Sequence, residues 1–133
     1  MIKEKMFKAA LMVRDKSYAP FSKFNVGASI LTDGDQIFSG CNVENSSYGN
    51  TLCAEASAIS AMIAGGFSSI KAILVTSGSS DKYCYPCGAC LQKISEFSND
   101  ETIVYLALSN GCIKELLLSK LIPYAFKIRD FLC

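Results

Sequence analysis

Two short segments of this chain combine the side chains that a catalytic metal centre needs. Cys53-Ala54-Glu55 opens one expected helix, and Pro86-Cys87-Gly88-Ala89-Cys90 opens another. A Cys-x-x-Cys pair at the start of a helix can place two sulfurs on one tetrahedral ion, and Cys53 would supply a third. Three protein ligands leave the fourth position for water, which is typical of catalytic rather than structural zinc sites.

Glu55 lies two residues after Cys53, so its carboxylate can approach the ion without binding it. The chain contains no histidine, and general acid–base catalysis must therefore fall to Glu, Asp, Lys, Tyr or Cys. A carboxylate in this position can take a proton from zinc-bound water and hand it on, which is what hydrolytic deamination needs. Both cysteine segments open helices, whose free N–H groups and positive dipole ends stabilise thiolates.

Two alternative interpretations of the cysteines remain open. Cys84 forms another Cys-x-x-Cys pair with Cys87, and as a fourth ligand it would close the site and make it structural. Free cysteines are also often ordinary core residues. Cys41, Cys112 and Cys133 have no role in the predicted site.

Composition limits the class of protein and its partners. The 133 residues are the length of one domain, and we predict a single domain over 1–133. Thirteen basic and twelve acidic residues are scattered without a run of Lys and Arg, so nucleic acid is not an expected partner. No apolar stretch is long enough to span a membrane, and the N-terminus lacks the apolar core of a signal peptide. Seven cysteines, an odd count, favour reduced thiols, and we predict a cytoplasmic protein.

Hydrophobic periodicity and turn signals predict the elements that must carry these residues. Pro20 and Gly65-Gly66 limit the first two helices, and Asp33-Gly34 marks a hairpin turn. The expected elements are a helix from Ile2 to about Ser17, strands over 25–31 and 36–41, a polar loop over 42–49, a helix over 52–64, a strand over 72–76, a helix over 87–97, a strand over 102–108 and a short helix over 113–118. This order predicts an α/β fold, a mixed sheet with helices packed against it.

Four segments together resemble the small homotetrameric cytidine deaminases. They are the two cysteine segments, Phe24-Asn25-Val26-Gly27-Ala28, and the loop from Cys41 to Gly49. The Cys-Ala-Glu and Pro-Cys-x-x-Cys pair is typical of the wider zinc deaminase superfamily, and the Asn-Val-Glu-Asn-Ser-Ser-Tyr-Gly loop indicates its nucleoside branch. The resemblance covers roughly residues 20–92, and the tail around 121–126 also fits.

The resemblance implies a reaction and the residues that perform it. Cytidine or deoxycytidine and water would give uridine or deoxyuridine and ammonia, with zinc-bound hydroxide attacking C4 and Glu55 as the proton shuttle. One zinc ion per chain would be bound by Cys53, Cys87 and Cys90. The substrate-binding residues would be Phe24, which stacks on the pyrimidine, Asn42 and Glu44, which bind the ribose hydroxyls, Ala54, and Tyr48 and Phe126, which help close the site of a neighbouring subunit.

The resemblance also implies a three-layer α/β fold, a mixed five-stranded sheet flanked by helices, and a homotetramer. The chain departs from the family pattern at two positions. Family members with three zinc thiolates usually follow Cys-Ala-Glu with Arg and often carry Arg after the last cysteine, where this chain has Ala56 and Leu91. An Arg there would offset the negative charge of the thiolates and make the bound water more acidic.

Two rival functions therefore stay open beside cytidine deamination. One is deamination of another aminopyrimidine nucleoside, such as a blasticidin-like antibiotic. The other is a catalytically silent zinc-binding interaction module that keeps the fold. Editing of nucleic acid is disfavoured, because the sequence shows no basic stripe to follow a phosphate backbone.

Overall fold

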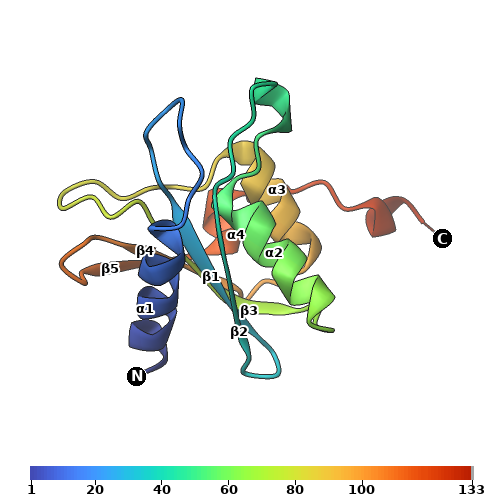
Figure 1. The fold of residues 1–133 in the computed structure, drawn as a ribbon. Coiled ribbons are helices and arrows are strands. Elements are labelled where there is room, and N and C mark those ends of the chain that lie inside the picture. The colour runs from blue at the N-terminus through green and yellow to red at the C-terminus, as the bar shows by residue number, and fades with distance from the viewer. Residues whose placement is uncertain (133) are drawn as a thin grey trace.

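A computed structural model describes residues 1–132 as a five-stranded sheet between two layers of helices (Figure 1). The strands lie in the order β2-β1-β3-β4-β5, with β3 and β4 parallel and the other neighbouring pairs antiparallel. The predicted α/β class with a mixed five-stranded sheet is therefore confirmed. The strands are β1 (Gly27–Thr32), β2 (Ile37–Cys41), β3 (Ile70–Thr76), β4 (Ile103–Ala107) and β5 (Ile113–Leu117).

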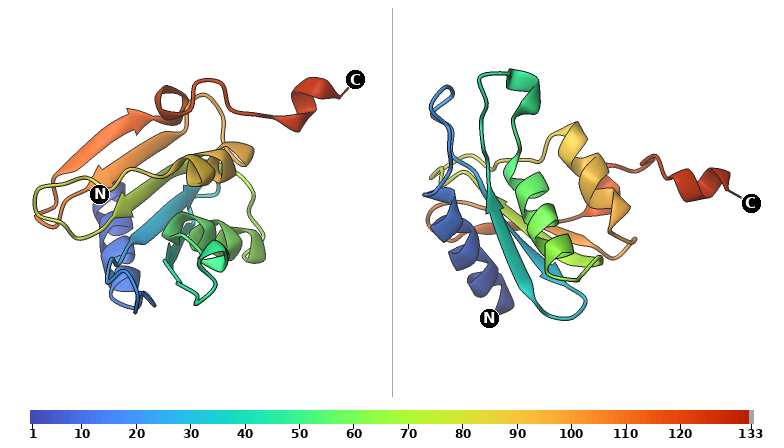
Figure 2. Two further views of the ribbon diagram at one scale, coloured as in Figure 1. Left: turned by 90° about the horizontal axis from the view of Figure 1, so that it is seen from above. Right: turned by 45° about the vertical axis from the view of Figure 1, so that its right-hand side comes forward.

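Helices cover both faces of this sheet. One view in Figure 2 shows α1 on one side of the sheet and α2 and α3 together on the other. No helix among residues 1–132 is long and apolar enough to cross a membrane. The helices are α1 (Ile2–Arg14), α2 (Ala54–Ala64), α3 (Gly88–Glu96) and α4 (Leu118–Leu121), with short 3₁₀ turns η1 (Tyr48–Asn50) and η2 (Ile128–Phe131).

Side chains of the strands alternate between two apolar cores, because successive residues of a strand point to opposite faces. Ala28 and Ile30 of β1 belong to the core under α2 and α3, whereas Leu31 packs with Met6 and Ala10 of α1. β3 is buried along nearly its whole length, as a central strand covered on both faces must be. The two cores fix the sheet between the helices and so fix where α2 and α3 begin.

Two glycines let the helices lie close to the sheet. A Cβ atom at Gly27 would overlap the carbonyl oxygen of Ala10 in α1. A Cβ atom at Gly40 would overlap the backbone nitrogen of Ala58 in α2. A side chain at Gly40 would therefore push away the helix whose first residues carry the predicted metal site.

The predicted helix over 113–118 is wrong, because this segment is strand β5, paired antiparallel with β4. A tight turn precedes it: the Leu108 N–H donates to the Cys112 carbonyl, and Gly111 has a φ of 89°. Asn110-Gly111 is the sequence signal for this hairpin, and it outweighs the helical spacing of the apolar residues in a six-residue segment.

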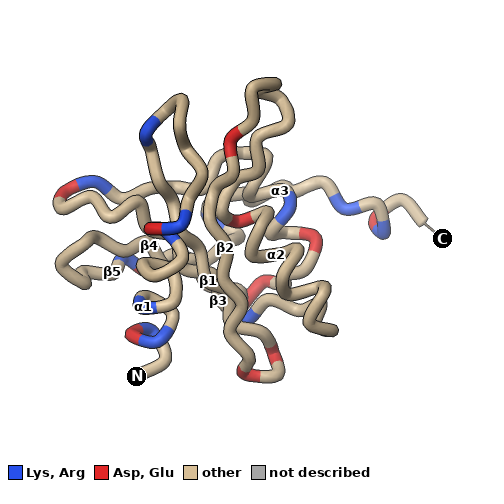
Figure 3. The backbone as a smooth tube through the Cα atoms, viewed as in Figure 1, with Lys and Arg blue, Asp and Glu red and all other residues tan. Residues whose placement is uncertain are grey.

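Other expected elements differ from the structure only at their ends. Helix α1 ends at Arg14 rather than near Ser17, because the Lys16 and Ser17 N–H groups bond to carbonyls three residues back. Basic and acidic residues are interspersed along the backbone (Figure 3). Cys133, which has no predicted role, lies outside the described residues.

After α4 the chain runs outward from the body of the molecule to η2 (Figures 1 and 2). Two hydrogen bonds join this C-terminal segment to α3. The Gln92 side-chain amide donates to the Phe126 carbonyl at 2.8 Å, and the Lys127 ammonium donates to the Ser95 carbonyl at 3.2 Å. Both bonds involve residues of this segment that precede η2.

Candidate metal centre and substrate cavity

Three cysteines meet where α2 and α3 begin, at the same end of the molecule (Figure 1). Cys53 is the N-cap of α2, Cys87 is the N-cap of α3, and Cys90 lies in the first turn of α3. Their Sγ atoms all lie within 4.8 Å of one another. Within residues 1–132 no other group of three His, Cys, Asp or Glu side chains comes together in this way.

The donor set fits one zinc ion. In a tetrahedral site with Zn–S bonds of about 2.3 Å, sulfurs lie roughly 3.8 Å apart, a spacing that these three can reach with small side-chain movements. Burial raises the pKa of the Cys53 and Cys90 thiols, so as thiolates these two require a nearby cation. The Cys90 backbone N–H lowers the pKa of Cys87, the exposed member of the set. One ligand is thus already disposed to ionise, and a divalent ion would ionise the other two.

Cys84 does not belong to this cluster. It is half-buried, packs against the core under α2 and α3, and lines the cavity beside the three sulfurs. Burial raises the pKa of its thiol to about 11, so it is a neutral wall at physiological pH. The geometry of residues 1–132 therefore offers three clustered thiols, and the interpretation of a closed four-cysteine site receives no support from it.

Glu55 lies in the first turn of α2 and is only 4% exposed. Burial raises the pKa of its carboxyl, an effect that a hydrogen bond with Cys90 and the charge of Lys93 partly offset. A carboxyl so placed can hold a proton closer to neutral pH than a surface glutamate can. It lies beside the sulfur cluster without being part of it.

One cavity of about 220 Å³ joins the cluster to Glu55 and to three of the predicted substrate-binding residues. Phe24, Asn42 and Ala54 line it, together with the four cysteines named above. Three further residues that line the cavity, Val26, Thr51 and Tyr85, were not predicted from the sequence. Proximity to the motifs was the available signal, because Thr51 precedes Cys53 by two residues and Tyr85 precedes Cys87 by two.

Asn42 holds the strand-like segment that carries Phe24. Its Nδ2 donates to the Phe24 carbonyl at 2.7 Å, and its Oδ1 accepts the Val26 N–H at 2.9 Å. Its own backbone carbonyl accepts the Tyr18 N–H. These bonds use one of the two amide hydrogens and one of the two oxygen lone pairs, so the side chain keeps one donor and one acceptor for a ligand.

Glu44 lies outside the cavity-lining set. Its Oε1 accepts the N–H groups of Phe21 and Ser22 at 2.9 and 3.2 Å, and its Oε2 accepts the Ser22 hydroxyl. The Ser22 hydroxyl, with these two N–H groups, lowers the pKa of the Glu44 carboxyl. In a single chain, Glu44 therefore serves as an anchor for the loop that leads to Phe24.

Tyr48 and Phe126 also lie away from the cavity of their own chain. Tyr48, 76% exposed, packs its ring edge-on against Phe21 with centroids 6.0 Å apart. Phe126, 57% exposed, stacks on Phe131 at 5.6 Å. Both rings are presented on the surface, on a protruding loop and on the C-terminal segment respectively.

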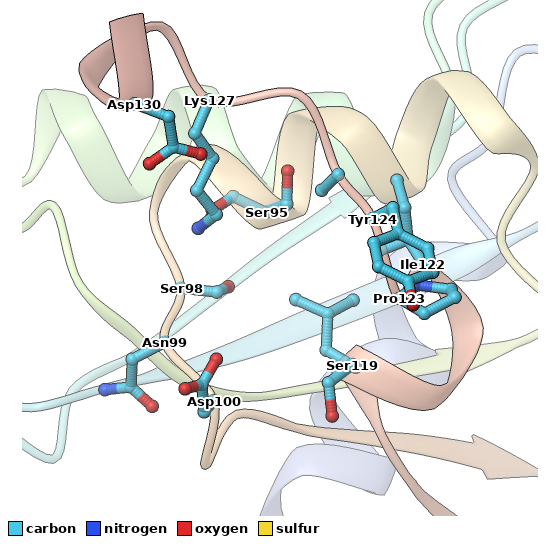
Figure 4. Close-up of a pocket in the computed structure, with 12 residues that line it drawn as sticks. Ser95, Ser98, Asn99, Asp100, Ser119, Ile122, Pro123, Tyr124, Lys127 and Asp130 are labelled. Carbon is cyan, nitrogen blue, oxygen red and sulfur yellow. The ribbon is translucent and has the colours of Figure 1, made fainter. Parts of the chain in front are cut away.

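A second cavity, of about 270 Å³, lies between the end of α3, α4 and the C-terminal segment (Figure 4). Ser95, Ser98, Asn99 and Asp100 enter it from the α3 side, and Lys127 enters it from the C-terminal segment. No cysteine lines it. It therefore lacks the donor set that marks the smaller cavity.

Comparison with known proteins agrees with this geometry. Residues 1–107 match the family model described as the cytidine and deoxycytidylate deaminase zinc-binding region. The cytidine deaminase of Sporosarcina psychrophila is 41% identical over 127 residues, which cover 96% of this chain and 93% of that protein. The cytidine deaminase of Halalkalibacterium halodurans is 37% identical over 130 residues, 98% of each chain.

Solved structures show the same likeness. The crystal structure of cytidine deaminase from Burkholderia pseudomallei superposes with a TM-score of 0.85 at 38% identity, covering 92% of this chain and 98% of that one. The crystal structure of cytidine deaminase from Mycobacterium tuberculosis superposes with a TM-score of 0.80 at 31% identity, covering 93% and 96%. The similarity therefore extends over nearly the whole chain and includes the site.

Proposed function

This chain belongs to the cytidine and deoxycytidylate deaminase zinc-binding family, and from that premise we propose that it hydrolyses the 4-amino group of cytidine or deoxycytidine. The products are uridine or deoxyuridine and ammonia. The observation that carries the proposal is the convergence of three clustered thiols and the buried Glu55 carboxyl on one cavity. At about 220 Å³ this cavity lies below the roughly 300–1,000 Å³ typical of drug-sized ligands, which suits a nucleobase.

Cys53, Cys87 and Cys90 would hold the zinc ion, which when bound would supply the Lewis acidity that makes a water molecule nucleophilic toward C4 of the base. Glu55 takes a proton from the attacking water and delivers it to the nitrogen that leaves as ammonia. Its burial supports this role, because the raised pKa lets the carboxyl hold the proton between the two transfers. The low exposure of the carboxyl limits its exchange with bulk solvent.

The base and sugar are bound by residues of the cavity and its rim. Phe24 stacks on the pyrimidine, and Ala54 contacts it from the start of α2; both line the cavity. Asn42 binds a ribose hydroxyl with the donor and acceptor that its backbone contacts leave over. Glu44 binds the other hydroxyl with its remaining lone pair, and its anchoring of the Phe24 loop supports a position at the rim.

The active unit is a single domain over 1–133, assembled as a homotetramer in which Tyr48 and Phe126 complete the site of a neighbouring subunit. Large exposed apolar side chains support this assembly, because contiguous patches of this kind mark interfaces. They lie on the loop before β1, on the loop between β2 and α2, and on the C-terminal segment: Phe21, Tyr48, Leu52, Tyr124, Phe126, Ile128, Phe131 and Leu132.

The proposed place of this reaction is pyrimidine salvage in the cytoplasm. Six cysteines in residues 1–132 are free thiols, which supports a reducing compartment. The interspersed charges of the chain support a small neutral substrate rather than nucleic acid or a membrane surface.

Ultraviolet monitoring of cytidine by purified protein of measured zinc content tests the proposal. We expect loss of the cytidine absorbance and release of one ammonia per nucleoside. A blasticidin-like nucleoside, run in parallel, separates the related substrate class. A protein with one zinc per chain that converts neither compound would be a silent zinc-binding module, and the proposal would be wrong.

A further inference from the structure

Tyr85 lines the substrate cavity but has no part in the mechanism above. We propose that Lys114 of β5 positions Tyr85 as an outer wall of this cavity, so that a residue remote in the sequence contributes to nucleoside affinity. This inference rests on the proposed function, since it assigns a role within the same site. Lys114 is a positioning residue in this proposal, and Tyr85 is the side chain that meets the nucleoside.

Lys114 contacts two aromatic side chains, of which Tyr85 lines the cavity. Its Nζ donates to the Tyr85 hydroxyl at 2.8 Å. The same ammonium lies 5.8 Å from the centroid of the Tyr83 ring, within cation–π range. No carboxylate within residues 1–132 pairs with Lys114. The tyrosines are thus the partners of this charge in the part of the chain that the structure describes.

Each end of this contact is fixed by a separate part of the fold. Lys114 belongs to the ladder between β5 and β4, where it pairs with Leu106. Tyr85 is joined to the ligand Cys87 through Pro86, whose ring fixes its own φ. The contact between Lys114 and Tyr85 therefore connects the edge strand β5 to the segment that carries the metal ligand Cys87.

Tyr85 needs such a support to act as a wall. Its side chain is 49% exposed, so apolar packing alone does not hold the ring in one rotamer. Phe24 and Tyr85 are the two aromatic residues that line the cavity, and they come from different loops. A flat base entering the cavity would meet an aromatic side chain from each loop, and such contacts contribute to binding.

The expected effect is on affinity rather than on the chemical step. The hydrogen bond from the ammonium to the Tyr85 hydroxyl favours the held rotamer by about fivefold, or roughly 1 kcal/mol. Losing the held rotamer weakens binding of the substrate and of the transition state equally. KM therefore rises and kcat stays unchanged.

Lys114→Met tests the proposal, because it removes the ammonium and keeps the length of the side chain. We expect KM for cytidine to rise about fivefold with kcat within about twofold, and uridine affinity measured by calorimetry to fall by the same factor. Tyr85→Phe, which removes only the hydroxyl, should also raise KM. The double variant should raise KM no further than Lys114→Met alone. Lys114→Arg, which restores the cation, should recover most of the affinity.

Lys3→Met is the matched control. Lys3 also lies 5.4 Å from a tyrosine ring, that of Tyr105, and pairs with Glu115, but it touches no residue of the cavity. We expect it to leave KM unchanged. If Lys114→Met lowers Tm while KM and uridine affinity stay at the wild-type values, Lys114 is a structural strut and the proposal is wrong. Additive effects in the double variant would also overturn it.

The two proposals fail separately. If the wild-type protein with bound zinc does not convert cytidine, the proposed function is wrong. Calorimetric binding of cytidine and uridine to the same variants still decides the role of Lys114, because it needs no turnover.

Discussion

Glu55 combines a buried position with a carboxyl whose pKa is raised by that burial, and such perturbed groups cluster at functional sites. Its helix start alone would explain an exposed glutamate, since acidic residues favour the first turn of a helix. A helix start does not explain why this carboxyl is buried beside three thiols, because removing a carboxyl from water costs free energy. A role in the site does explain it. The position of Glu55 thus favours a role as a proton carrier.

Glu55→Gln keeps the size and hydrogen bonding of the side chain but removes its proton. We expect turnover to fall by at least about a hundredfold while zinc stays bound, because the zinc ligands are untouched. Steady-state kinetics together with metal analysis of the purified variant checks this. Near-normal turnover in the zinc-loaded variant would remove Glu55 from the mechanism.

Cys84→Ser distinguishes a wall from a ligand. Since Cys84 stands outside the sulfur cluster, we expect one zinc per chain before and after the change. Cys87→Ser is the positive control, and it should lose most of its zinc because it removes one of three ligands. Metal analysis after dialysis against a mild chelator measures both. Loss of zinc from Cys84→Ser would instead indicate that Cys84 is a fourth ligand of a closed structural site.

At the scale of elements, the starts of α2 and α3 create the electrostatics of the site. Each helix N-terminus contributes up to roughly half an elementary charge, which partly offsets the negative charge that three thiolates bring to a divalent ion. Ala56 in the first turn of α2 and Leu91 in α3 add no positive charge. The helix dipoles therefore supply compensating charge at these two helix starts, and the Lys93 charge, which lowers the pKa of Glu55, lies further along α3.

Ala56→Arg should make the enzyme faster at neutral pH. A guanidinium beside the sulfurs would draw electron density from them and so strengthen the pull of the metal on its water. We expect the acidic limb of the pH–rate profile to move to lower pH, since the nucleophile would form at lower pH.

The full pH–rate profiles at matched zinc content measure this effect. Ser60→Arg is the matched control, because Ser60 is exposed and lies one turn further along α2. It adds the same charge to the same helix and should leave the profile in place. Superimposable profiles for Ala56→Arg and wild type would mean that another group compensates the thiolates.

At the scale of the whole molecule, the chain leaves large apolar side chains exposed on its protruding loops and its C-terminal segment. A C-terminal segment held by two hydrogen bonds, with Phe126 stacked on Phe131, has little packing of its own. Both features are explained together if neighbouring subunits cover these surfaces.

We expect light scattering to show a homotetramer, and mixing of variants to show that its sites are shared. Phe126→Ala and Glu55→Gln should each lose activity. The two variants should then be unfolded, mixed and refolded together. The activity of the mixture should exceed the summed activities of the variants refolded separately, because mixed assemblies contain sites with both residues intact. A fully active monomer would contradict the shared site.

The spacing of residues along the sequence was enough to predict the central residues of the candidate site. Cys53, Glu55, Cys87 and Cys90 could be predicted because two- and three-residue offsets at a helix start have a narrow range of geometries. The family resemblance supplied the five-stranded sheet and the cavity residues Phe24 and Asn42. The helix predicted over 113–118 failed because six residues satisfy a period of 2 and a period of 3.6 almost equally well.

Only the tertiary structure decided what lies next to what across the fold. The pairing of β5 with β4 brings Lys114 to Tyr85, and no spacing along the chain predicts that contact. The same holds for the exclusion of Cys84 from the cluster, since its Cys-x-x-Cys spacing with Cys87 equals that of Cys87 with Cys90. The physical reason is that Cys90 stands on a helical turn that folds its sulfur back toward Cys87, whereas Cys84 lies in non-helical chain that packs into the core.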